Sequence, residues 1–198
     1  MPSALSEGTN PNPVIPGPTR ILFEPMDLLK IKAFAFDIDG VATDGSILCI
    51  PGGDLLRVYD AKDSFAVRMA TMNGYPVAVI TGGSSESIRE RMVTTGLKPE
   101  DVFLHCRDKM DQFRMFCERY ALQPEDVMYF GDDVPDITVL EACGCGVCPA
   151  DAVEDVKAAA DYVSPFPGGK GCLRDTIEKV MRAQGRWIFD TTVYKKKF

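Results

Sequence analysis

Short apolar runs that end in acidic residues or glycines recur along the chain. Residues 31–39 (IKAFAFDID) end in two carboxylates, residues 75–81 (YPVAVIT) are followed by two glycines, and residues 127–131 (VMYFG) are followed by two aspartates. Uninterrupted apolar runs of this length are typical of strands that are buried on both faces. The pattern therefore predicts three buried strands, each with small or polar residues at its end.

Stretches with helix-like spacing of apolar residues lie between and after these runs. They cover residues 64–73, 85–96, 109–120, 136–143 and 172–184, and further short strands are expected at residues 145–148 and 161–163. Strands that alternate with helices form a parallel sheet with helices on both faces. We therefore expect a three-layer, Rossmann-like α/β fold that binds its ligand at the carboxyl ends of the strands.

One segment, at about residues 46–59, breaks this alternation. Two β-prone stretches, ILCI and LLRVY, flank the turn-forming sequence PGGD at residues 51–54. This pattern predicts a β-hairpin. A two-stranded ribbon is marginally stable alone, and this one carries apolar residues on both strands. We therefore expect the hairpin to protrude from the core and to pack against another subunit.

The composition and net charge of the chain limit the kinds of molecule that it is expected to bind. The 198 residues, 45% of them hydrophobic, suffice for one substantial core, and the net charge of −7 argues against nucleic acid or an anionic membrane as the main partner. No apolar run approaches the roughly 18 residues that are needed to cross a bilayer. Seven cysteines without a recognisable secretory leader indicate reduced thiols and a cytoplasmic location.

Carboxylates follow two of the predicted strands and are the first candidates for chemistry. Asp37 and Asp39 end the first run, and Asp132, Asp133 and Asp136 follow the third. Acidic residues at strand ends also cap helices and fill turns, so either pair alone is weak evidence. Gathered at one sheet edge, however, these acids would repel one another strongly unless a cation neutralised them. Mg²⁺ prefers such oxygen ligands and leaves room for waters and a phosphate.

The order of polar motifs along residues 31–185 resembles that of the haloacid dehalogenase superfamily. The matching residues are Asp37-x-Asp39, Thr81 after an apolar strand, Lys109 at a helix start, and Gly131-Asp132-Asp133-x-x-Asp136. The resemblance implies a haloacid dehalogenase fold and a phosphatase that works through an aspartyl phosphate. The resemblance also implies that Asp37 attacks phosphorus and that Asp39 protonates the leaving oxygen and then activates water.

The same resemblance assigns the surrounding residues. It implies that Thr81, Gly82 and Gly83 hold phosphate oxygens and that Lys109 offsets negative charge on the nucleophile and the transferred group. The resemblance also implies that Mg²⁺ is held by Asp37, by the main-chain carbonyl of Asp39 and by Asp132, and that Asp133 and Asp136 support its waters and orient Lys109.

The spacing of these motifs leaves no room for a cap domain. Only 44 positions separate Asp37 from Thr81, and 28 separate Thr81 from Lys109. These segments hold the core elements, a helix and the hairpin. An uncapped site is open to water and has few residues that recognise the leaving group. We therefore expect a neighbouring subunit to complete the site.

Several segments resemble the cap-free 3-deoxy-D-manno-octulosonate 8-phosphate phosphatase family. They are DIDGVATDG (residues 37–45), the hairpin, VITGG, GDDVPD and PGGKGCLRDTIEKVMRAQGRW. The resemblance implies a homotetramer in which hairpins form a barrel and a neighbour's carboxy-terminal tail closes the site. It also implies that Arg57, Lys62 and Lys170 bind the sugar acid. Many members have an arginine at the position of Gly83 and a glycine at that of Ser64, which leaves the sugar open.

Other interpretations of the sequence remain. One alternative is that the substrate is a related nine-carbon ulosonic acid phosphate or another small phosphomonoester. A second alternative is that the chain is not an enzyme but a non-catalytic scaffold or regulatory subunit. The intact acidic and lysine motifs argue against the scaffold. The sequence Cys143-x-Cys145-x-x-Cys148 invites a metal-site reading, but it lacks a second ligand cluster, so we expect the thiols to serve in packing.

Three segments divide the chain. Residues 1–25, rich in Pro, Ser, Asn and Gly, are expected to form a flexible N-terminal arm, and residues 26–185 the phosphatase domain. Residues 186–198 are expected to form a tail. Its three lysines, Lys195 to Lys197, would supply cations to an acidic substrate if the tail covers a neighbour's pocket.

Overall fold

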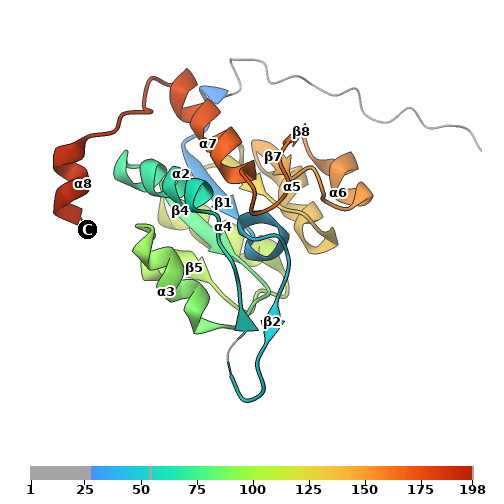
Figure 1. Ribbon diagram of the computed structural model, residues 1–198. Coiled ribbons are helices and arrows are strands. Elements are labelled where there is room, and N and C mark those ends of the chain that lie inside the picture. The colour runs from blue at the N-terminus through green and yellow to red at the C-terminus, as the bar shows by residue number, and fades with distance from the viewer. Residues whose placement is uncertain (1–27, 54, 198) are drawn as a thin grey trace, which may run out of the picture.

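Six apolar segments pair as one parallel sheet in the computed structural model, which describes residues 28–53 and 55–197 (Figure 1). The strands are β1 (Ala33–Phe36), β4 (Val77–Ile80), β5 (Val102–Phe103), β6 (Val127–Phe130), β7 (Cys145–Cys148) and β8 (Tyr162–Val163). Their order across the sheet is β5-β4-β1-β6-β7-β8. The three strands predicted from the apolar runs are β1, β4 and β6, and every residue in them is buried, which confirms their place at the centre.

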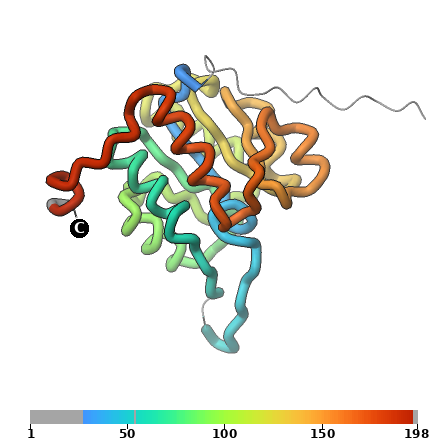
Figure 2. The backbone as a smooth tube through the Cα atoms, turned by 45° about the horizontal axis from the view of Figure 1, so that its top comes forward, coloured from blue at the N-terminus to red at the C-terminus, as the bar shows by residue number. Residues whose placement is uncertain are grey.

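Helices cover both faces of this sheet (Figure 2). They are α2 (Ala61–Met72), α3 (Glu86–Thr94), α4 (Lys109–Arg119), α5 (Ile137–Ala142), α6 (Glu154–Ala159) and α7 (Cys172–Ala183). A further helix, α8 (Thr191–Lys197), lies on the C-terminal tail, away from the sheet (Figure 1). Alternate side chains of β1 serve opposite layers: Phe34 and Phe36 pack with α2, α3 and α7, and Ala33 and Ala35 pack with α4, α5 and α6. The predicted three-layer α/β fold is therefore confirmed.

Strand order reverses at β1. This strand pairs with β4 on one side and with β6 on the other, so Phe36 stands beside both Val79 and Phe130. The segments that follow these three strands therefore emerge at one edge of the sheet. A reversal of this kind separates the connections and opens a crevice at the carboxyl ends of the strands.

The predicted hairpin is present and protrudes from the core (Figure 1). Its strands, β2 (Leu48–Cys49) and β3 (Leu55–Leu56), pair antiparallel and expose their apolar side chains, with Leu48 63% exposed. Between Asp37 and Lys109 the described residues form only this hairpin, α2, β4, α3, β5 and the short turns η1 (Ile38–Ala42) and η2 (Pro99–Asp101). The described chain thus has no cap domain, as its spacing predicts.

The observed boundaries differ from the prediction mainly at α2, which begins at Ala61 instead of residue 64. Asp60 caps this helix, and its side chain accepts hydrogen bonds from the backbone N–H groups of Lys62 and Asp63. The predicted N-terminal arm, residues 1–25, lies outside the described residues. Within the described part of the chain, no helix has the length and apolar character that a membrane crossing requires.

Candidate active site

A cavity of about 320 Å³ lies at the carboxyl ends of β1, β4 and β6. Its lining brings together the acidic pair after β1, the loop after β4, the start of α4 and the turn after β6. The lining residues are Asp37, Asp39, Thr81, Gly82, Gly83, Cys106, Arg107, Lys109, Asp132, Asp133, Pro135 and Asp136. The cavity therefore lies at the sheet edge where strand order reverses.

Asp37 follows β1 directly, in an extended conformation that turns its side chain into the cavity. Its Oδ1 accepts a hydrogen bond of 2.7 Å from the backbone N–H of Ile38, and its Oδ2 lies 2.9 Å from Nζ of Lys109. Only 8% of the residue is exposed. The carboxylate is therefore held firmly at the floor of the cavity.

Lys109 is the first residue of α4, a helix that Asp108 caps through a hydrogen bond with the N–H of Met110. The lysine is 5% exposed, and its ammonium group lies between Asp37 and Asp136, 2.7 Å from Oδ1 of the latter. Burial lowers the pKa of Lys109, but attraction by Asp37 and Asp136 outweighs burial, and the pKa is raised. Lys109 is therefore a fixed positive charge.

Asp136 holds this lysine and the turn after β6 together. It is completely buried, and its Oδ1 also accepts a hydrogen bond of 2.5 Å from the hydroxyl of Tyr129. Its Oδ2 accepts hydrogen bonds from the backbone N–H groups of Asp132 and Asp133, at 3.2 and 3.4 Å. Asp133 lies at the exposed rim and caps the turn η4 (Val134–Asp136). Asp136 therefore orients Lys109 directly.

Three carboxylates in the cavity are close enough to share a cation. One oxygen each of Asp37, Asp132 and Asp136 lies within 4.8 Å of the others. Burial raises the pKa of Asp37 to about 6, with Lys109 opposing and Asp136 adding to the shift. Burial, followed by the charges of Asp37 and Asp136, raises the pKa of Asp132 to about 7. These carboxylates therefore resist ionising together without a further positive charge.

Two features of this cluster fit a divalent cation. Oδ1 of Asp132 is buried and has no hydrogen-bond partner among the described residues, an arrangement that costs free energy unless a ligand satisfies it. Gly40, at φ +91°, admits the Asp132 carboxylate, because a Cβ at this position would lie 2.0 Å from Oδ2 of Asp132. The donors are all carboxylate oxygens, which suit a hard cation.

The loop after β4 supplies a hydroxyl and a glycine backbone. Thr81 is 1% exposed, and its Oγ1 accepts a hydrogen bond of 3.1 Å from the N–H of Gly83. The carbonyl of Gly83 in turn accepts a hydrogen bond from the N–H of His105, which fixes the loop against the segment before α4. The N–H of Gly83, predicted to hold phosphate, is therefore bonded to Thr81 in this structure.

Arg57 reaches the cavity wall from the segment after β3 of the same chain. Its Nε lies 2.6 Å from Oδ1 of Asp39 and its Nη2 lies 2.9 Å from Oδ2, a bidentate ion pair. The arginine side chain is only 3% exposed, whereas that of Asp39 is 25% exposed and faces the cavity. Arg57 therefore belongs to the site through Asp39.

The other two predicted substrate cations lie apart from the cavity lining. Lys62 is exposed at the start of α2. Lys170 is exposed on the loop before α7, where its Nζ lies 3.6 Å from Asp44. Within this chain, the structure gathers the predicted catalytic and metal residues but not these two lysines.

Sequence reasoning missed three contributors to the site. Arg107 is exposed and lines the cavity together with Cys106, and Tyr129 donates its hydroxyl to Asp136 from within β6. The signal for Arg107 is its position two residues before Lys109. The signal for Tyr129 is a polar tip in an otherwise apolar buried strand, which usually finds a partner.

Sequence comparison places the chain beside known phosphatases. The family of haloacid dehalogenase-like hydrolases matches residues 87–171. The 3-deoxy-D-manno-octulosonate 8-phosphate phosphatase of Escherichia coli K12 is 33% identical over 157 residues, which cover 79% of this chain and 82% of the relative. The enzyme of that name from Haemophilus influenzae is 32% identical over 165 residues, or 83% of this chain and 91% of the relative.

Solved structures with the same fold carry related names. The 3-deoxy-D-manno-octulosonate 8-phosphate phosphatase of Yersinia pestis superposes with a TM-score of 0.79 at 28% identity, covering 82% of this chain and 87% of that one. The Moraxella catarrhalis enzyme, in complex with magnesium ion, phosphate ion and a KDO molecule, gives 0.78 at 26% identity, covering 82% and 92%.

The raised pKa values predict pH-dependent binding of Mg²⁺, the cation expected from the sequence. Below about pH 6 to 7, Asp37 and Asp132 hold protons in the metal-free protein, so binding must displace them. Affinity should therefore rise with pH by about tenfold per unit for each proton released, and level off above about pH 8. Calorimetry in buffers of different ionisation enthalpy measures both affinity and proton release.

Asp132→Asn is the matched variant for this titration. It removes one charge and one titrating ligand, so binding should be weaker and its pH dependence flatter. An affinity for Mg²⁺ that stays constant between about pH 5 and pH 8 in the unaltered protein would contradict a site built on these carboxylates.

Proposed function

Because the chain belongs to the 3-deoxy-D-manno-octulosonate 8-phosphate phosphatase family of haloacid dehalogenase-like hydrolases, we propose that it hydrolyses 3-deoxy-D-manno-octulosonate 8-phosphate. The observation that carries the proposal is the buried Asp37–Lys109–Asp136 triad, which shares one cavity with Thr81 and Asp132. A related nine-carbon ulosonic acid phosphate is the alternative substrate, since Gly83 and Ser64 depart from the family pattern.

Asp37 is the proposed nucleophile. One of its oxygens forms a bond to phosphorus as the bond from phosphorus to the sugar oxygen breaks, and Asp39 gives its proton to that leaving oxygen. In the second half, Asp39 takes a proton from water, whose oxygen attacks phosphorus and releases Asp37 and inorganic phosphate. Asp39 thus gives up one proton and regains one over the cycle, and both acids face the cavity.

Charge compensation accounts for the remaining residues. Mg²⁺, for which we propose Asp37, Asp132 and the main-chain carbonyl of Asp39 as ligands, supplies positive charge that offsets the phosphoryl group. Lys109, held between Asp37 and Asp136, keeps a second positive charge beside the nucleophile. The Thr81 hydroxyl lies in the same cavity, and we propose that it and the glycine backbone after β4 bind phosphate oxygens.

A homotetramer is part of the proposal. The hairpin exposes an apolar surface of a kind that protein chains normally cover. Its exposed residues include Ile47, Leu48, Ile50, Leu56 and Val58. With no cap in the described chain, a neighbouring copy would enclose the sugar and bring Lys62, Lys170 or the tail toward a second cavity.

The pathway and location follow from the proposed substrate. A phosphatase for this sugar acid would act in lipopolysaccharide biosynthesis. We place it in the cytoplasm on the strength of its seven cysteines, none of which forms a disulfide within the described chain.

Replacing the proposed nucleophile gives a direct test. Asp37→Asn keeps the shape of the side chain but removes the attacking charge, so Mg²⁺-dependent phosphate release should fall at least ~1,000-fold for sugar and aryl phosphates alike. Asp111→Asn, an exposed carboxylate on α4, is the control and should keep full activity. Phosphate release that survives in Asp37→Asn would show that another residue attacks phosphorus.

A panel of substrates tests the sugar. The kcat/KM for 3-deoxy-D-manno-octulosonate 8-phosphate should exceed that for hexose 6-phosphates by at least ~100-fold, because a site that binds a carboxylate rejects a sugar without one. Phosphorylated nine-carbon ulosonic acids complete the panel. A higher kcat/KM for one of them would replace the eight-carbon substrate, and equal values for acids and hexoses would reject the substrate class.

Light scattering tests the assembly. We expect four chains per particle at micromolar concentration, and Leu48→Asp should shift the population toward smaller particles because it places a charge on the apolar hairpin. Leu29→Asp is the control, since Leu29 is 56% exposed but lies outside the hairpin. A fully active monomer would contradict a site shared between subunits.

A further inference from the structure

The bidentate pair between Arg57 and Asp39 occupies the proposed acid–base residue. Both carboxylate oxygens face the guanidinium, at 2.6 and 2.9 Å, and the plane of the carboxylate is fixed by two parallel hydrogen bonds. Nη1 of the same arginine donates to the carbonyl of Leu55, which ties the guanidinium to the hairpin. In this arrangement Asp39 has neither oxygen turned toward a leaving group.

Gly83 makes this position of Arg57 possible. A Cβ on Gly83 would lie 3.3 Å from Nη2 of Arg57 and 2.9 Å from Cδ1 of Ile88. The missing side chain therefore leaves space beside the phosphate loop, and the guanidinium of Arg57 uses it. The loop after β4 therefore leaves room for the arginine, and its hydrogen bonds to Asp39 and Leu55 position it.

Asp39 stands between Arg57 and the cavity. Asp39 lines the cavity and is 25% exposed, whereas the side chain of Arg57 is 3% exposed and does not belong to the lining. A ligand therefore reaches the guanidinium only when Asp39 moves aside. The other buried cation, Lys109, is already shared by Asp37 and Asp136.

We propose that Arg57 is the specificity-determining residue that couples recognition of a substrate carboxylate to release of Asp39. The sugar carboxylate takes the place of Asp39 on the guanidinium, and Asp39 turns toward the oxygen that leaves phosphorus. The inference rests on the proposed function, because it needs an acidic sugar phosphate and Asp39 as acid and base. No covalent bond changes in this exchange.

The exchange favours acidic substrates because it replaces one carboxylate, that of Asp39, with another, that of the substrate. A carboxylate that displaces Asp39 restores the two charge-assisted hydrogen bonds of Arg57, whereas a neutral sugar breaks the ion pair with Asp39 and puts no carboxylate in its place. A neutral substrate therefore reacts only in the small fraction of molecules in which Asp39 has separated from Arg57 without the help of a ligand. The same contact thus rejects neutral phosphomonoesters.

The test compares Arg57→Gln with the unaltered protein on two substrates, the ulosonic acid phosphate and a hexose 6-phosphate. Arg57→Gln should lower kcat/KM for the acid ~100-fold and raise that for the hexose, because Asp39 is no longer held in the ion pair, so the acid-to-hexose ratio falls more than ~100-fold. Arg57→Lys keeps the charge without the bidentate fork and should give an intermediate ratio. Calorimetry with the phosphate-free sugar acid should show at least ~10-fold weaker binding in Arg57→Gln.

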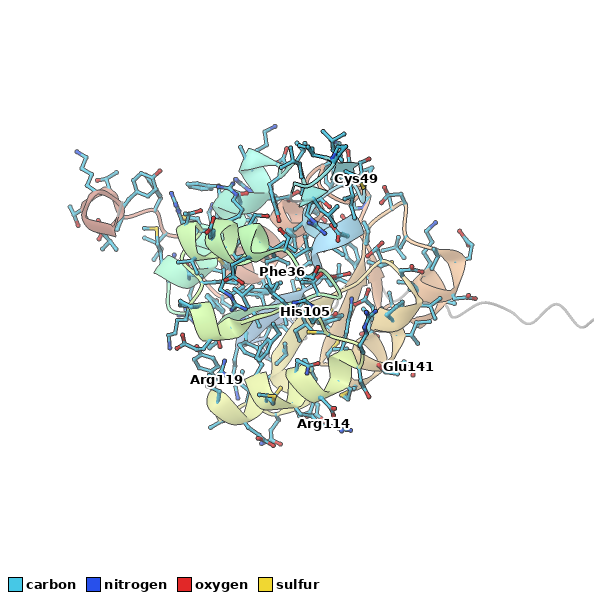
Figure 3. All side chains as sticks on the ribbon, turned by 90° about the horizontal axis from the view of Figure 1, so that it is seen from below. Phe36, Cys49, His105, Arg114, Arg119 and Glu141 are labelled. Carbon is cyan, nitrogen blue, oxygen red and sulfur yellow. The ribbon has the colours of Figure 1, made fainter. Side chains whose placement is uncertain are left out.

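Arg114→Gln is the matched control. Arg114 lies on α4 near one edge of the molecule, and Cys49 of the hairpin lies near the opposite edge (Figure 3). The side chain of Arg114 is 67% exposed. The substrate ratio should not change in this variant. If Arg57→Gln does not fold, the substrate ratio of Arg57→Lys decides.

The outcomes separate this inference from the proposed function. Equal losses on acid and hexose would mean that Arg57 only anchors the hairpin, and would overturn the proposed gate while leaving the phosphatase intact. An unaltered protein that does not prefer acids would instead reject the proposed substrate class, whatever the Arg57 variants do.

Discussion

Compensation of negative charge at the end of β1 is the constraint on which the site depends. Asp37, Asp132 and Asp136 lie within 4.8 Å of one another, and one buried ammonium group, that of Lys109, bridges two of them. Removing that lysine would leave buried carboxylates without their partner, which is the costly way to break a buried ion pair. Oδ1 of Asp132, which has no hydrogen-bond partner in the described part of the chain, is where a cation would complete the balance of charge. The proposed nucleophile, the lysine and the proposed metal ligands are therefore parts of one electrostatic unit.

Sequence predicts this unit because register in a parallel sheet is regular. Phe36 is paired with Val79 and Phe130, so the residues just beyond all three strands must meet at one edge. Apolar runs identified the strands, and the polar residues that follow them therefore identified Asp37, Thr81 and the aspartates after β6. Lys109 was predictable only from the order of motifs, since nothing in its own neighbourhood separates it from a surface lysine.

Contacts that depend on tertiary packing were not predictable in the same way. The Arg57–Asp39 pair requires the segment after β3 to return to the turn that follows β1, and it also uses the space that Gly83 leaves. No local pattern encodes either condition. Likewise, Lys62 and Lys170 are positively charged, as Arg57 is. They lie outside the cavity lining, because the start of α2 and the loop before α7 hold them elsewhere. Charge and motif position suggest which cations could bind the substrate, but the path of the backbone decides which of these cations lies at the site.

One extended segment carries both the arginine that we propose for selectivity and the apolar residues that we propose for assembly. Along residues 56–58, exposure alternates: Leu56 is 46% and Val58 76% exposed, whereas the side chain of Arg57 is 3% exposed. Successive side chains of an extended chain point to opposite sides, so the face that presents apolar residues outward also directs Arg57 toward Asp39. A partner that covers the outer face would stiffen this segment and hold the arginine in register. An uncapped phosphatase can therefore draw its selectivity from the same hairpin through which it would assemble.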